Sequence, residues 1–146
     1  IGGGSGNAKN RVNHAIRRFD PEGNFVNQLP FLQPEKVSSQ IQGSDIFVFA
    51  SSCENLPITL LEGMASGLAI ASSDMGPMPE VLGQGGAYFD PEKPQSIADA
   101  IELLINNPKL REDSIKCAIN NSKNFSWKEC SDETFNFLSN YNVSKQ

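Results

Sequence analysis

The sequence has few of the residues that build metal centres and disulfide frameworks. Among its 146 residues there are three cysteines, Cys53, Cys117 and Cys130, and one histidine, His14. Their positions lack the paired spacing of zinc ligands and of redox-active cysteines. An odd, scattered set of cysteines is typical of reduced thiols inside a cell. We therefore expect no metal site and a cytoplasmic protein.

Positive charge and long apolar runs are also scarce. The 12 Lys and Arg residues are outnumbered by 17 Asp and Glu residues, so the net charge is −5. This balance argues against nucleic acid as a partner and against broad contact with an anionic membrane. No apolar stretch is long enough to span a bilayer. Hydrophobic residues make up 38% of the chain, which is enough to form the core of one ordinary domain.

Apolar and amphipathic segments alternate along the chain. Short apolar runs, which favour strands, lie at 25–29, 46–50, 68–71 and 87–89. Helical spacing of apolar residues is found at 7–19, 34–42, 77–82, 96–106 and 108–121. Such alternation predicts an α/β fold with a doubly wound parallel sheet of about five strands, followed by C-terminal helices.

Local signals mark the ends of two further helices. Asn55 or Leu56 is expected to cap a helix that has Pro57 in its first turn. A glycine at position 67 is suited to end that helix. A capping box formed by Ser126 and Glu129 predicts the start of a last helix.

The segment from Glu54 to Glu62 is the most informative part of the sequence. Glu54 follows the apolar run at 46–50, and Glu62 lies on the helix expected after it. In open α/β sheets, ligands bind where strands end, and the first-turn N–H groups of a helix favour an anion. Two carboxylates beside an anion site suit a ligand that carries hydroxyls as well as phosphate. This combination indicates a sugar nucleotide.

The same segment resembles the Glu-x7-Glu signature of the family 4 retaining glycosyltransferases, whose GT-B fold has two Rossmann-like domains. The resemblance extends to the strand before it, Ser44-Asp45-Ile46-Phe47-Val48-Phe49-Ala50-Ser51-Ser52. It continues through Leu60-Leu61-Glu62-Gly63-Met64-Ala65-Ser66-Gly67-Leu68, then Ser73-Asp74-Met75-Gly76-Pro77-Met78-Pro79-Glu80-Val81-Leu82 and Gly86-Ala87-Tyr88-Phe89-Asp90-Pro91. Residues 26–106 match the family well, although Pro30 and Ala69 replace the more usual glycine and proline.

The resemblance implies roles for individual residues. Glu62 is expected to bind the ribose hydroxyls of the donor, and Glu54, the candidate catalytic residue, to lie near the donor sugar. Backbone N–H groups are expected to cradle the distal phosphate and sugar at Asn55, Leu56, Ile58 and Thr59. The remaining donor-binding candidates are Gly3 and Gly4 for the diphosphate, and Phe31 and Leu32 for the nucleotide base. No cofactor or metal is implied.

The glycine-rich segment at 2–6 could instead belong to the dinucleotide-binding fingerprint of a Rossmann fold. That explanation fails because Asn7 stands where the third glycine belongs, and no acidic residue ends the run at 25–29. The start instead suggests that residues 1–146 form one nucleotide-sugar-binding domain, N-terminally truncated, whose first βα unit and acceptor-binding N-terminal domain lie upstream of Ile1.

The resemblance implies a hexosyltransferase of polysaccharide or glycoconjugate synthesis. Its donor would be a nucleoside diphosphate sugar. The N-terminal domain would bind the acceptor and would make any contact with the inner face of a membrane. This chain alone is expected to be inactive. A GT-B epimerase or phosphorylase and a non-catalytic nucleotide-sugar-binding module remain alternatives. The base, sugar, acceptor and linkage stay open.

Overall fold

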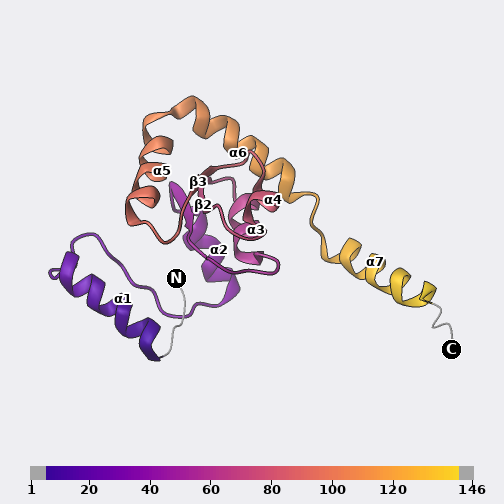
Figure 1. Ribbon diagram of the computed structural model, residues 1–146, viewed down its shortest axis with the longest axis horizontal. Coiled ribbons are helices and arrows are strands. Elements are labelled where there is room, and N and C mark those ends of the chain that lie inside the picture. The colour runs from indigo at the N-terminus through magenta and orange to yellow at the C-terminus, as the bar shows by residue number, and fades with distance from the viewer. Residues whose placement is uncertain (1–5, 142–146) are drawn as a thin grey trace. The chain divides into compact units, whose positions relative to one another are not determined.

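A computed structural model describes residues 6–141, and the chain divides after Gln40 into two compact units (Figure 1). The first unit contains helix α1, Gly6–Phe19, close to the helix expected at 7–19. Helix α2, Pro34–Gln42, has the predicted bounds and leads into the second unit. The predicted sheet and the Glu54–Glu62 segment both lie in the second unit.

The strand expected at 25–29 does not form. The buried carboxylate of Asp20, which follows α1, accepts hydrogen bonds from the backbone N–H groups of Asn24, Phe25 and Val26, at 2.7, 3.0 and 2.6 Å. These bonds occupy N–H groups that a strand would use for its ladder. Burial raises the pKa of Asp20, but the backbone N–H donors outweigh it and hold the pKa below its usual value. The segment is therefore an extended loop.

Three parallel strands form the sheet of the second unit. They are β1, Ile46–Phe49; β2, Ala69–Ser73; and β3, Ala87–Phe89, in the order β1-β2-β3. Phe47 pairs with Ile70, and Ala71 pairs with Ala87. The predicted parallel pairing is confirmed, although residues 6–141 contain three strands rather than about five.

Helices pack on both faces of this sheet, so the predicted doubly wound α/β fold is confirmed. One face carries α3, Ile58–Ala65; α4, Met78–Leu82; and α6, Pro108–Ser122, and the other carries α5, Pro94–Asn106. The first core consists of Leu60, Met64, Ile70, Met78, Val81, Leu82 and Ala118. The second consists of Ala69, Ala71, Ala87, Phe89, Ala100 and Leu104. Alternate residues of β2 point into the two cores, as strand geometry requires.

The predicted helix ends hold at two positions. Gly67, just after α3, has φ of 77°, a left-handed conformation that favours glycine, and it ends the helix. The Oγ of Ser126 accepts a 3.0 Å hydrogen bond from the N–H of Glu129 and caps α7, Trp127–Asn140.

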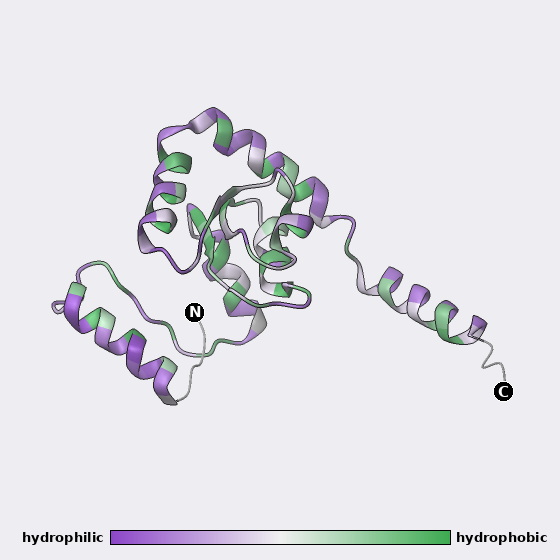
Figure 2. Ribbon diagram, in the orientation of Figure 1, coloured by the Kyte–Doolittle hydropathy of each residue, from purple (hydrophilic) through white to green (hydrophobic). Residues whose placement is uncertain are grey.

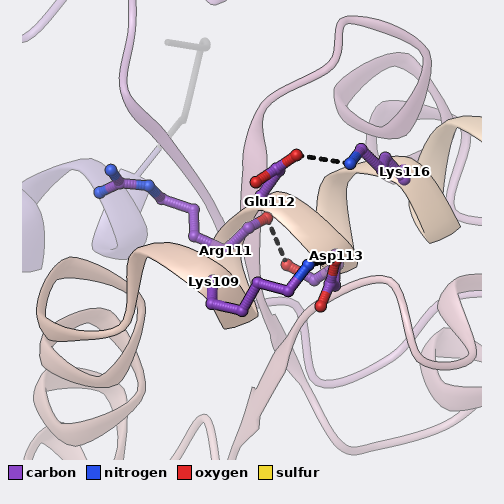
Figure 3. A network of polar contacts seen from close by, with 6 residues as sticks. Lys109, Arg111, Glu112, Asp113 and Lys116 are labelled. Atoms are coloured by element: carbon purple, nitrogen blue, oxygen red, sulfur yellow. Dashed lines mark hydrogen bonds and ion pairs between the residues drawn. The ribbon is translucent and has the colours of Figure 1, made fainter.

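Helix α6 carries charged pairs on its solvent side, shown in Figure 3. Lys109 donates to Asp113 at 2.8 Å, and Lys116 pairs with Glu112, one turn apart in each case. All four side chains are largely exposed, so solvent screens the charges and each pair adds little to the stability of the helix. The pairs support α6 locally, and the buried residues of the two cores supply most of the stability.

Helix α7 differs from the other helices of the second unit because none of its residues is buried. Its sequence alternates polar and apolar side chains, as the colours of Figure 2 show. Its large apolar side chains lie in solvent: Trp127, Phe135, Leu138 and, at its C-cap, Tyr141 are all more than 60% exposed. Within residues 6–141, no helix is long and apolar enough to cross a bilayer.

The hydroxyl of Tyr88 on β3 provides a pH-dependent contact. It donates a 2.6 Å hydrogen bond to the carbonyl of Gly83, and burial, reinforced by the charge of Cys117, raises its pKa to about 12. A raised folded-state pKa adds stability that is complete below pH 10 and is lost as the pH rises towards 12. We expect the tyrosinate absorbance of a Tyr141→Phe variant, which leaves Tyr88 as the one tyrosine, to titrate near pH 12. A midpoint near 10 would contradict the buried contact.

Candidate active site at the carboxyl edge of the sheet

Glu54 lies in the loop that leaves the carboxyl end of β1, as predicted. The strand ends at Phe49, and the loop runs from there to the start of α3. The Glu54 side chain is half-buried, whereas its neighbours Cys53 and Asn55 are exposed. Because the three strands are parallel, the loops after β2 and β3 begin at the same edge of the sheet.

A tight turn at Pro57 forms the start of α3. Pro57 has φ of −79° and ψ of 76°, and the N–H of Ile58 donates a 2.9 Å hydrogen bond to the carbonyl of Leu56. This is an inverse γ-turn. The predicted cap at Asn55 or Leu56 is wrong, because the turn makes buried Pro57 the N-cap and α3 has no side-chain cap.

The first turn of α3 keeps donors free for a ligand. Its first helical bond runs from the N–H of Leu61 to the carbonyl of Pro57, at 3.1 Å. Among the residues described, no backbone acceptor receives the N–H groups of Thr59 and Leu60. The positive end of the helix dipole coincides with these donors, so the turn favours an anion such as a phosphate.

Glu62 lies on the exposed side of α3 and borders a cavity of about 600 Å³. The cavity runs along α3 from Leu56 to Ala65 and is closed on its other side by the segment before α7 and by the first two turns of α7. Its lining consists of Leu56, Ile58, Leu61, Glu62, Ala65, Ser122, Asn124, Phe125, Ser126, Trp127, Glu129, Cys130, Glu133 and Thr134. The size falls within the usual range of small-molecule sites.

The structure brings together some of the predicted site residues and not others. Leu56, Ile58 and Glu62 share the cavity, whereas Glu54, Asn55 and Thr59 are not part of its lining. The exposed Phe31 and the half-buried Leu32 lie in the first unit, and their role stays a prediction. Gly3 and Gly4 lie outside the described residues.

Sequence reasoning missed the α7 side of the cavity. From the sequence, Glu129 had a place only in the capping box, and Trp127 and Glu133 had no role at the site, yet all three border the same cavity as Glu62. The capping box at Ser126 located the start of α7. No sequence signal indicated that this start lies beside α3, more than sixty residues earlier.

A charge pair at the same edge of the sheet was also missed. In the loop after β3, the Asp90 carboxylate pairs with Lys93 at 2.7 Å and accepts the N–H of Glu92 at 3.0 Å. The pKa of Asp90 lies below its usual value, mainly because of the hydrogen bond from Lys93 and also because of the N–H of Glu92. The exposed carboxylate of Asp74 also raises the pKa of Lys93, though less than Asp90 does. This lysine is therefore engaged by the loop itself.

Solved structures with similar folds are glycosyltransferases. Sucrose-phosphate synthase from Thermosynechococcus elongatus superposes with a TM-score of 0.80 over 94% of this chain and 37% of its own, at 18% identity. Anabaena HepE in complex with UDP superposes with a TM-score of 0.78 over 91% of this chain and 37% of its own, at 19% identity. The fold is thus one Rossmann-like half of a GT-B enzyme.

Sequence comparison agrees with the fold. O-antigen chain mannosyltransferase B of Escherichia coli is 26% identical over 83% of this chain and 32% of its own length. A D-inositol 3-phosphate glycosyltransferase of Corynebacterium diphtheriae is 26% identical over 80% of this chain and 25% of its own length. The chain thus spans a quarter to a third of the length of these two relatives. Because residues 1–121 match the family model of the group 1 glycosyl transferases, the chain belongs to that family.

Proposed function

We propose that this chain is the donor-binding half of a retaining glycosyltransferase, which transfers a hexose from a nucleoside diphosphate sugar to a hydroxyl acceptor. One observation carries the proposal: α3 begins with free N–H groups directly after Glu54 and carries Glu62 one turn further on. The site thus offers donors for a phosphate and carboxylates for hydroxyls. The binding of UDP by HepE, a protein of the same fold, supports a nucleoside diphosphate as ligand.

The proposed roles follow the chemistry of each group. The Glu62 carboxylate accepts hydrogen bonds from the two ribose hydroxyls, and charge-assisted bonds of this kind are the stronger ones. The N–H groups of Thr59 and Leu60 bind the distal phosphate. Glu54, half-buried in the loop after β1, accepts from the hydroxyls of the donor sugar.

The same groups serve the reaction itself. When the bond between the anomeric carbon and the diphosphate breaks, its electron pair leaves with the phosphate oxygen. Negative charge then grows where the free N–H groups of α3 point, and fixed donors stabilise such charge without rearranging. We propose that no metal is required. Among residues 6–141, no three Asp, Glu, His or Cys side chains gather as a metal site.

A titration of the chain with UDP, GDP and ADP, and with their glucose and mannose derivatives, tests the proposal. We expect one nucleoside diphosphate to bind with a Kd in the high micromolar range or weaker. This corresponds to a binding free energy of no more than about 6 kcal/mol. An epimerase would interconvert the free sugar nucleotide, and a phosphorylase would require a cofactor-bearing lysine. Absence of binding by all three nucleotides would overturn the proposal.

The chain by itself is expected not to turn over its donor. Catalysis needs a second domain to close the cleft, exclude water and present the acceptor hydroxyl. Incubation with the donor that binds and a panel of hydroxyl acceptors should therefore release no nucleoside diphosphate above the rate of the donor alone. Steady glycosyl transfer would show that residues 1–146 contain the complete catalytic machinery, with Glu54 the first residue to test.

A further inference from the structure

Helix α1 carries a concentration of positive charge that the composition of the whole chain hides. Its 14 residues contain no aspartate or glutamate and four cations, Lys9, Arg11, Arg17 and Arg18, which give it a charge of +4. Because the net charge of the chain is −5, the other residues sum to −9. A basic segment in an otherwise acidic chain indicates a local site for an anionic partner.

One face of α1 is polar throughout and entirely exposed. A helix turns once in about 3.6 residues, so positions 7, 10, 11, 14, 17 and 18 share a face. This basic face consists of Asn7, Asn10, Arg11, His14, Arg17 and Arg18, and all six residues are exposed. The apolar side of the helix, opposite to it, consists of Val12, Ala15, Ile16 and Phe19. The basic face is therefore presented independently of what packs on the apolar side.

No carboxylate neutralises the basic face. Three lysines of α6 and α7 each pair with an acidic residue one turn away: Lys109 with Asp113, Lys116 with Glu112 and Lys128 with Asp132. Within residues 6–141, no cation of α1 forms an ion pair. The carboxylate that follows the helix, Asp20, is buried and accepts three backbone N–H groups instead. The charge of α1 is thus available to a partner outside the chain.

The shape of the basic face suits an extended array of phosphates. An arginine side chain binds a phosphate through two parallel hydrogen bonds. A small phosphate ligand needs a concave site, whereas this face is the convex surface of a helix and extends over about 16 Å from Asn7 to Arg18. The headgroups of a lipid bilayer offer phosphates in a plane, which such a helix can contact along its length.

Nucleic acid is the other extended array of phosphates, and the surroundings of α1 do not suit it. In a helix-turn-helix, a turn of about 3–4 residues separates the two helices. Here an extended loop follows α1, and the next helix begins only at Pro34. Proteins that bind single strands stack the bases on aromatic side chains. The basic face contains no Phe, Tyr or Trp, so lipid headgroups fit it better.

We propose that the basic face of α1 binds the headgroups of an anionic lipid bilayer. This inference goes beyond the proposed function and does not depend on it, because α1 belongs to the first unit and the donor site to the second. The contact is peripheral, since no helix within residues 6–141 could span a bilayer. An anionic surface repels the rest of the chain, with its charge of −9, so the contact should be limited to α1.

Flotation of the whole chain with lipid vesicles, without any nucleotide, tests the proposal. Phosphatidylcholine vesicles that contain about one third phosphatidylglycerol should bind the chain, and vesicles of phosphatidylcholine alone should not. Raising the salt concentration from about 0.1 M to about 1 M should release it, because the Debye length falls from about 10 Å to about 3 Å. The proposal is overturned by no binding, by equal binding to both vesicles, or by binding to a DNA duplex but not to the vesicles.

Two double variants that remove the same charge show whether α1 is responsible. Arg11→Gln with Arg17→Gln should lower the partition coefficient onto anionic vesicles roughly thirtyfold, about fivefold for each arginine near the surface. Lys109→Gln with Lys116→Gln removes two cations from α6, where each is paired with a carboxylate, and should change the coefficient little. Glutamine favours helices about as well as arginine and lysine, so circular dichroism should show unchanged helicity in both. Equal losses in the two variants would assign the binding to net charge and overturn the role of α1.

Discussion

Replacing Glu62 with glutamine should weaken the binding of the nucleoside diphosphate sugar by about 1–3 kcal/mol, the usual effect of removing a charged partner from a hydrogen bond. Glutamine keeps the size of the side chain but replaces the charged acceptor with a neutral amide. Glu62 is exposed and makes no interaction that holds the fold, so stability should hardly change. Calorimetric titration of both proteins, in the form that contains the acceptor-binding part, measures the difference.

Two comparisons make this result specific to the ribose. Glu80→Gln removes another exposed carboxylate, on the neighbouring helix α4, and should leave donor affinity unchanged. A deoxyribose donor should bind wild type more weakly but lose little further in Glu62→Gln, because the substitution and the missing hydroxyl remove the same contact. Unchanged affinity of Glu62→Gln for the full donor would contradict the assignment of Glu62.

Leu60→Ala should lower the free energy of unfolding by about 2–5 kcal/mol. Leu60 is fully buried in the core beneath α3, where Met64, Ile70 and Met78 belong to the same cluster. Truncating it removes apolar contact and leaves a cavity that the close-packed surroundings fill only in part. A whole domain is stable by about 5–15 kcal/mol, so the variant should lose a large share of its stability.

Urea denaturation measures this loss as a lower midpoint with an unchanged slope. Leu103→Ala is the matched control, because Leu103 on α5 undergoes the same chemical change while 45% exposed. Its effect should stay below about 1 kcal/mol. Equal losses in the two variants would show that α3 is not anchored through Leu60.

The sequence alone determined the local elements and the family. Unbroken apolar runs at 46–50 and 87–89 identified two strands of the parallel sheet to within a residue, because strands covered by helices on both faces are rich in apolar side chains. The bounds of α2 and the cap at Ser126 followed from equally local rules. The spacing of Glu54 and Glu62, with the motifs around them, sufficed to predict a glycosyltransferase domain before any contact was known.

Tertiary structure decided what depends on partners distant in the sequence. The run at 25–29 has the composition of a strand, but a strand exists only when a neighbour receives its hydrogen bonds, and Asp20 takes those N–H groups instead. The cap of α3 was missed because the turn at Pro57 and the burial of that ring, rather than Asn55, fix where the helix starts. The cavity is lined by α3 and by the first turns of α7, two segments more than sixty residues apart in the sequence. Only the path of the chain in three dimensions brings such distant segments to one cavity, so Trp127 and its neighbouring carboxylates were found in the lining only from the structure.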